Sequence, residues 1–128
     1  MNLRLLGTFV CLLSSCLLGV PASAQELGEV VAEFDSPGCC PMGITFARRQ
    51  LWIADRRANK LYALDPGSGK VISELPTPGI RPTGITFDGR HLWVADRDKP
   101  ELFRLDPRTA LVDRVFKTSV RAPRGMAW

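Results

Sequence analysis

A repeat of 41 residues constrains the fold of this chain more than any other feature. The sequence that begins at Pro41 and the sequence that begins at Pro82 align over more than twenty positions without a gap. The residues that recur at this spacing include Gly43 and Gly84, Trp52 and Trp93, Asp55 and Asp96, and Pro66 and Pro107. The same spacing extends backward to residues 28–38 and forward to residues 123–128. A fixed period of this length indicates several copies of one supersecondary unit.

Each unit predicts four short strands. In the first complete unit the predicted strands cover residues 44–46, 50–54, 60–64 and 70–75. Asp65-Pro66-Gly67 gives a turn after the third strand, and Asp88-Gly89 in the second unit is a strong hairpin signal. Four-stranded antiparallel sheets repeating at about 40 residues are typical of β-propeller blades, whereas the coils of a β-solenoid are usually shorter. The sequence therefore predicts an all-β fold of about two and a half blades of an incomplete propeller.

The repeat also sets the expected boundaries. Blade 1 should cover residues 41–81, blade 2 residues 82–122, and residues 123–128 should start a third blade. Residues 25–40 contain a fourth-strand equivalent, Glu29 to Phe34, which is expected to be the last strand of a preceding or closing blade. Because a closed propeller needs at least four blades, we expect this chain to be the N-terminal portion of a longer product or, alternatively, one of several chains in a shared ring.

The first 24 residues have the pattern of a secretory signal peptide. Arg4 is followed by an apolar stretch from Leu5 to Val20, and Ala22-Ser23-Ala24 fits a signal peptidase site. This stretch is short for a transmembrane helix. The sequence around Cys16 resembles a lipobox, so lipidation at Cys16 is the alternative that would keep the protein on a membrane. The mature chain is expected to be secreted or periplasmic and to start at Gln25.

Composition argues against several function classes. The 17 Lys and Arg residues, against 13 Asp and Glu, give a net charge of +4, but they are scattered, so a nucleic-acid partner is not indicated. One His and four Cys leave little material for a metal site or a His-based catalytic network. The sequence predicts no metal and no catalytic residues, and it leaves the cofactor unknown.

The repeated motifs resemble those of a known group of proteins. P-x-G-I-T-F, L-W-[I or V]-A-D and L-[Y or F]-x-L-D-P, followed by Gly-Lys-Val, resemble the YVTN and NHL-type propeller repeats. These repeats also occur in streptogramin lyase-like and gluconolactonase-like six-bladed propellers, and the resemblance covers residues 28–128. It implies an exported module that binds a ligand or protein partner, or else the N-terminal fragment of a propeller enzyme of the lactonase, lyase or cyclotransferase type.

By analogy with such propellers, ligands bind in the loops at one end of the blades, around the central channel. Arg56, Arg97 and Arg81 fall in these loops and are the candidate ligand-binding residues. The neighbouring Asp55 and Asp96 recur in register, so we interpret them as acceptors for backbone N–H groups that hold each blade alike.

Cys39 and Cys40 interrupt the repeat, because they stand where the next unit has Ile80 and Arg81. Two adjacent thiols in an exported protein are expected to be oxidised. They can each pair with another cysteine or form a vicinal disulfide with one another; metal binding or redox work is the remaining alternative.

Overall fold

The computed structural model describes residues 28–128. All eight strands of the described residues lie in one compact unit, residues 32–128. The predicted signal peptide, with Cys16, lies outside the described residues. Within residues 28–128 there is no helix that could cross a membrane.

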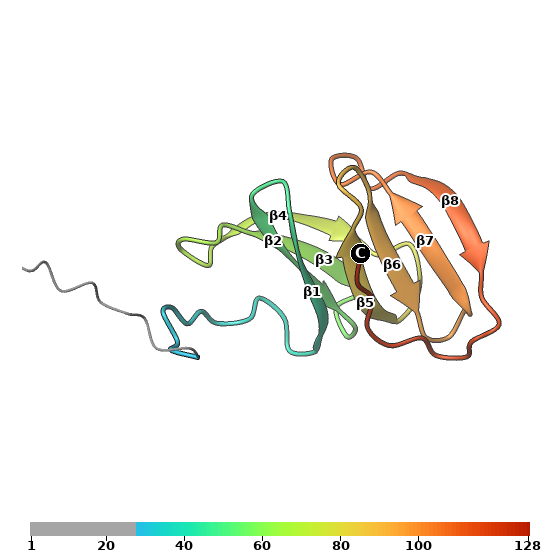
Figure 1. Cartoon of the computed structure of the whole chain (residues 1–128), viewed down its shortest axis with the longest axis horizontal. Coiled ribbons are helices and arrows are strands. Elements are labelled where there is room, and N and C mark those ends of the chain that lie inside the picture. Colours follow the sequence, from blue (N-terminus) through green and yellow to red (C-terminus); the bar gives the residue numbers. More distant parts are fainter. Residues whose placement is uncertain (1–27) are drawn as a thin grey trace, which may run out of the picture. The chain divides into compact units, whose positions relative to one another are not determined.

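The strands form two separate four-stranded antiparallel sheets, each in chain order (Figure 1). Blade 1 consists of β1 (Pro41–Ala47), β2 (Gln50–Asp55), β3 (Lys60–Leu64) and β4 (Val71–Pro76). Blade 2 consists of β5 (Pro82–Phe87), β6 (Leu92–Asp96), β7 (Glu101–Leu105) and β8 (Val112–Lys117). The all-β prediction and the four strands per unit are confirmed, although β1 begins three residues earlier than predicted.

Strand pairing repeats in the same register as the sequence. Gly43 lies opposite Ala54 in blade 1, and Gly84 lies opposite Ala95 in blade 2. In both sheets the pairing register shifts just before this glycine. A second shift occurs between β3 and β4 in blade 1 and between β7 and β8 in blade 2. The irregularities are therefore part of the repeated unit.

An aspartate closes the turn after the third strand of each blade. Asp65 Oδ1 accepts hydrogen bonds from the N–H groups of Gly67 at 3.1 Å and Ser68 at 2.8 Å, and Asp106 Oδ1 does the same in blade 2. Gly69 has a positive φ of 69° in this turn, and Ala110 takes the equivalent place with a φ of 59°. The aspartate, and not the glycine, is therefore the constant part of the turn.

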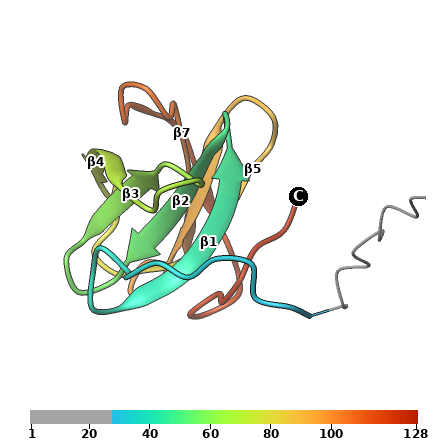
Figure 2. The same cartoon turned by 90° about the vertical axis from the view of Figure 1, so that its left-hand side faces the viewer.

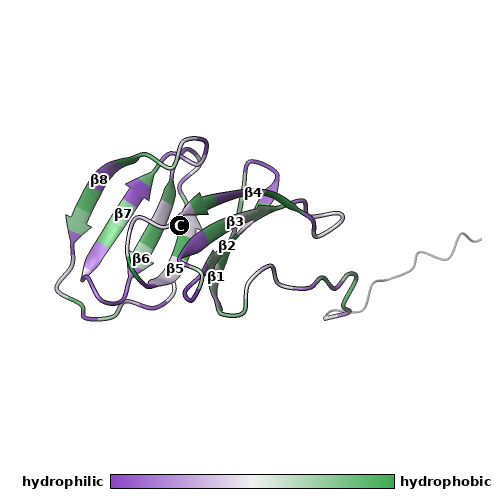
Figure 3. Ribbon diagram, turned by 180° about the vertical axis from the view of Figure 1, so that it is seen from behind, coloured by the Kyte–Doolittle hydropathy of each residue, from purple (hydrophilic) through white to green (hydrophobic). Residues whose placement is uncertain are grey.

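The core lies between the two sheets, which pack face to face. Blade 1 contributes Trp52, Ala54, Leu61 and Ala63, and blade 2 contributes Ile85, Leu92, Val94 and Leu105. Leu75 and Phe87 pack against this cluster from β4 and β5. Hydrophobic residues recur along the strands of both sheets (Figure 3), as expected for blades that are covered on both faces.

The closest approach between the blades is made by glycine. A Cβ atom on Gly43 would lie 3.0 Å from Ile85 N and 3.1 Å from Gly84 Cα, so a larger residue would push apart β1 and β5, which lie side by side (Figure 2). The contact recurs one unit later, since a Cβ on Gly84 would lie 3.3 Å from the backbone of Gly125. Residues 123–128 therefore lie along β5 as β5 lies along β1.

The two partial units have no strand pairing of their own. Residues 123–128 are not in a strand, although the hydroxyl of Thr83 donates to the carbonyl of Pro123 at 2.5 Å. The segment Glu29 to Phe34, predicted as a fourth strand, is also not in a strand. A fourth strand pairs with a third strand, and in the described residues β3 and β7 already pair with β4 and β8. That Glu29 to Phe34 completes a closing blade stays a prediction.

Candidate functional site

A buried aspartate at the end of the second strand ties together two loops of each blade. The side chain of Asp55 is fully buried. Its Oδ2 accepts a hydrogen bond from Cys40 N at 2.7 Å, and its Oδ1 accepts hydrogen bonds from Arg57 N at 2.9 Å and Ala58 N at 2.7 Å. One carboxylate thus joins the loop before β1 to the turn after β2.

Blade 2 repeats this arrangement. Asp96 is also fully buried, and it accepts hydrogen bonds from Arg81 N at 2.7 Å, Asp98 N at 2.8 Å and Lys99 N at 2.9 Å. A Cβ atom on Gly79 would collide with the Asp96 carboxylate, and Gly38 has the same relation to Asp55. We call each of these carboxylates, with its three N–H donors, an aspartate clamp.

The clamps shift the ionisation of both side chains. Burial by itself would raise the pKa values of Asp55 and Asp96, but the backbone N–H donors outweigh it, and both pKa values lie below the ordinary value of 3.8. The interpretation of these residues as structural acceptors agrees with this geometry.

The clamped loops bring the predicted arginines together at one end of the blades. Arg56 N donates to Cys40 O at 3.0 Å, and Arg97 N donates to Arg81 O at 2.9 Å. Between the blades lies a depression of about 660 Å³ with no acidic lining residue. It is lined by Cys40, Arg56, Arg57, Asn59, Ile80, Arg81 and Arg97. We call Arg56, Arg57, Arg81 and Arg97 the arginine cluster.

The sequence prediction missed two polar members of this lining, Arg57 and Asn59, as well as the apolar Ile80. Arg57 and Asn59 are the members that can contact a polar ligand. Both belong to the turn after β2, and neither recurs, because blade 2 has Asp98 and Pro100 in their places. A search for repeated residues therefore passes over them. Asp98 forms an ion pair with Arg81, with 3.2 Å between Arg81 Nε and Asp98 Oδ2. The remaining arginines of the cluster have no ion pair within the described residues.

Cys39 and Cys40 lie beside the arginine cluster as thiols. Their Sγ atoms are 3.7 Å apart, with no disulfide between them. The contact with Cys39, and then burial, raise the pKa of the Cys40 thiol. The pairing of the two cysteines stays a prediction. No group of three or more metal-ligating side chains occurs in the part of the chain that is described.

The single histidine belongs to a network at the other end of blade 2. Asp88 accepts hydrogen bonds from the N–H groups of Arg90 and His91 and from Trp93 Nε1 at 2.8 Å. Burial would raise the pKa of Asp88, but these donors lower it well below its ordinary value. His91 Nδ1 lies 3.4 Å from the same carboxylate. This geometry suits a structural role for His91 at the start of β6.

Comparison with known proteins identifies the fold. No protein-family model matches the chain, and no curated protein matches it. Among solved structures, Kuenenia stuttgartiensis hydrazine synthase is similar with a TM-score of 0.59 and 20% identity over 79% of this chain. Myxococcus xanthus glutaminyl cyclase is similar with a TM-score of 0.59 and 17% identity over 69% of this chain. A streptogramin B lyase is similar with a TM-score of 0.55 and 20% identity over 69% of this chain.

These likenesses and the two repeated sheets define the class of protein: the chain has the β-propeller fold, with two complete blades in its described residues. The chain spans 29% of the hydrazine synthase chain, 38% of the glutaminyl cyclase chain and 30% of the streptogramin B lyase chain.

The aspartate clamp predicts how stability depends on pH. Because the folded pKa of Asp96 is lowered, its carboxylate stabilises the fold above about pH 4, and this contribution is lost as the pH falls below the ordinary value of 3.8. The substitution Asp96→Asn should lower the free energy of unfolding at pH 7 by about 1–3 kcal/mol, since one backbone donor then faces an amide NH₂. It should also make the melting temperature fall less steeply as the pH is lowered from about 5 through the ordinary aspartate pKa of 3.8.

Circular dichroism melts across this pH range provide the measurement, with the exposed Asp35→Asn as the matched control. Parallel acid dependence in the wild type and Asp96→Asn would show that the clamp does not couple protonation to folding.

Proposed function

We propose that this chain is an exported β-propeller module that binds an anionic ligand at the arginine cluster. The observation that carries the proposal is the convergence of Arg56, Arg57, Arg81 and Arg97 on one depression without an acidic lining residue. Like charges gathered in this way repel one another unless an anion joins them. A guanidinium group presents a planar fork of donors that matches a carboxylate or a phosphate.

The depression has the size and the support of a ligand site. Its volume of about 660 Å³ falls in the range usual for small-molecule pockets. The backbone on both sides is held by the clamps of Asp55 and Asp96, so less conformational entropy is lost when a ligand binds. Arg81 is already oriented by its ion pair with Asp98, and an incoming anion would share that arginine.

Titration with inorganic phosphate and with citrate, followed by NMR chemical shifts, tests the anion site. The double variant Arg56→Gln/Arg97→Gln should bind either anion at least about tenfold more weakly, because a hydrogen bond to a charged group contributes about 1.5–3 kcal/mol. The matched control is Arg90→Gln, which removes one exposed arginine from the turn between β5 and β6 at the opposite end of the blade. Equal affinities in all three proteins would refute the arginine cluster as the site.

Export is supported by the first 24 residues of the sequence. A positive residue, an apolar stretch and an Ala-x-Ala site occur there in the order that signal peptidase requires. Intact mass measurement of the chain recovered from a bacterial host should give an N-terminus at Gln25. A lipidated N-terminus at Cys16 would mean membrane anchoring, and an unprocessed Met1 would contradict export.

A second candidate is the N-terminal portion of a six-bladed propeller enzyme. The likeness to a glutaminyl cyclase and to a streptogramin B lyase favours it. The single histidine of this chain is engaged by Asp88, so within this sequence the arginine cluster is the better supported site.

A further inference from the structure

Each blade leaves one apolar face uncovered by the other. The outer face of blade 1, which we call the leading face, carries Ile44, Phe46, Leu51, Ile53 and Leu64. Ile44 is 61% exposed and Phe46 is 59% exposed. The outer face of blade 2, which we call the trailing face, carries Thr86, Trp93, Leu102 and Phe116. The guanidinium of Arg104, which stands where blade 1 has Ala63, also lies on this face, 5.8 Å from the centroid of the Trp93 ring.

The leading face has a copy elsewhere in the molecule that is already covered. Ile44, Leu51 and Leu64 stand 41 residues before Ile85, Leu92 and Leu105. Those three counterparts are 2%, 0% and 0% exposed, because they pack against blade 1. The leading face therefore has the side chains of a surface that packs on a propeller blade.

The trailing face has its own covered copy. Trp93 and Leu102 correspond to Trp52 and Leu61, which are 2% and 0% exposed in the core between the blades. Phe116 corresponds to Leu75, which packs against the same core. Apart from Arg104, which replaces the buried Ala63, the two outer faces thus correspond to the two halves of a contact that the molecule already makes once.

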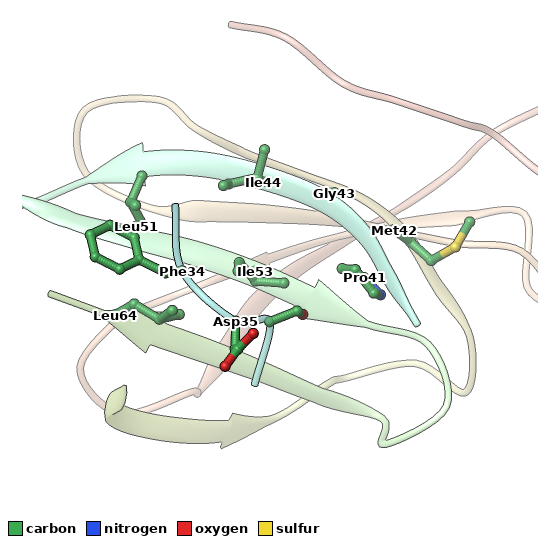
Figure 4. Close-up of a pocket in the computed structure, with 10 residues that line it drawn as sticks. Phe34, Asp35, Pro41, Met42, Gly43, Ile44, Leu51, Ile53 and Leu64 are labelled. Atoms are coloured by element: carbon green, nitrogen blue, oxygen red, sulfur yellow. The ribbon is translucent and has the colours of Figure 1, made fainter. Parts of the chain in front are cut away.

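Single side chains from the partial units rest on both faces. Phe34 lies over Leu51 and Leu64 in an apolar depression of about 460 Å³ (Figure 4). Trp128 stacks on Trp93 with ring centroids 6.0 Å apart, yet it is 79% exposed. Both belong to segments without strand pairing, so a complete sheet can displace them at low cost.

We infer that the leading face of one copy packs on the trailing face of a second copy and repeats the contact between blade 1 and blade 2. Phe46 of the second copy then takes the place of Trp128 against Trp93. Phe116 of the first copy takes the place of Phe34 over the leading face of the second copy. Both replacements follow from the sequence, since Phe46 and Trp128, like Phe34 and Phe116, are two repeat units apart.

Such a contact is head-to-tail, and its repetition gives a closed ring when the rotation per copy closes. The described residues of each copy contribute two complete blades. The inference does not depend on the arginine cluster, and its test leaves that site unchanged.

Sedimentation velocity of the full chain over a hundredfold concentration range provides the test. We expect a discrete oligomer to form as the concentration rises. Phe46→Asp should weaken the association by at least tenfold, because it removes the apolar ring that packs on Trp93 in the proposed contact. The matched control is Leu111→Asp, which changes another exposed apolar residue, at 69%, in the turn between β7 and β8. The N-terminal segment is the same in Phe46→Asp and Leu111→Asp, so a difference in association between these variants arises from the substituted position.

Deletion of residues 123–128 gives an independent readout. It removes the segment that competes for Trp93, so the association should become tighter, and Phe46→Asp in the deleted chain should abolish it. A monomer at every concentration in both the wild type and the deletion variant would overturn the inference and point to another occupant of the faces. Association that survives Phe46→Asp, or that falls equally in Leu111→Asp, would overturn it as well.

Discussion

The packing of one four-stranded sheet on the next is the interaction on which the rest of this structure depends. A single blade has apolar side chains on both faces and cannot bury them alone. Trp52, Leu61 and Ala63 become fully buried only because blade 2 covers them. The glycines at positions 43 and 84 allow this, since any larger residue at Gly43 would press on the backbone of the neighbouring strand. The outer faces of the two blades are not covered in this way, so Ile44 and Phe46 on blade 1 stay exposed.

The same repeat organises the end of the blades where the arginines gather. Asp55 and Asp96 are buried carboxylates whose hydrogen bonds hold the loops before the first strand and after the second. The side chains of these loops need not repeat, because the clamp uses only their backbone N–H groups. The clamps are therefore made by repeated residues, while the lining of the depression combines the repeated Arg56 and Arg97 with residues such as Arg57 and Cys40 that differ between blades.

The repeat made the fold predictable, and the exceptions have physical causes. Strand order, turns and the role of the aspartates follow from residues that recur every 41 positions. Whether Glu29 to Phe34 forms a strand depends on the presence of a partner strand, which no local pattern reveals. The two tryptophans also differ: Trp93 Nε1 donates to Asp88, whereas Trp52 Nε1 is buried without a partner, because Ala47 stands where blade 2 has Asp88. The sequence did not predict that Arg57 lies near Arg81, because this depends on the relative positions of the turn after β2 and the loop before β5.

The central claim is that successive sheets pack in the register of the repeat, with Gly43 against Gly84. A nuclear Overhauser effect between the α-protons of these two glycines tests it most directly, since a Cβ built on Gly43 lies 3.1 Å from Gly84 Cα. The account predicts a strong cross-peak between Gly43 and Gly84, alongside the cross-peaks between Gly43 and Ala54 expected within blade 1. Cross-peaks within the blade without any between the two glycines would contradict it.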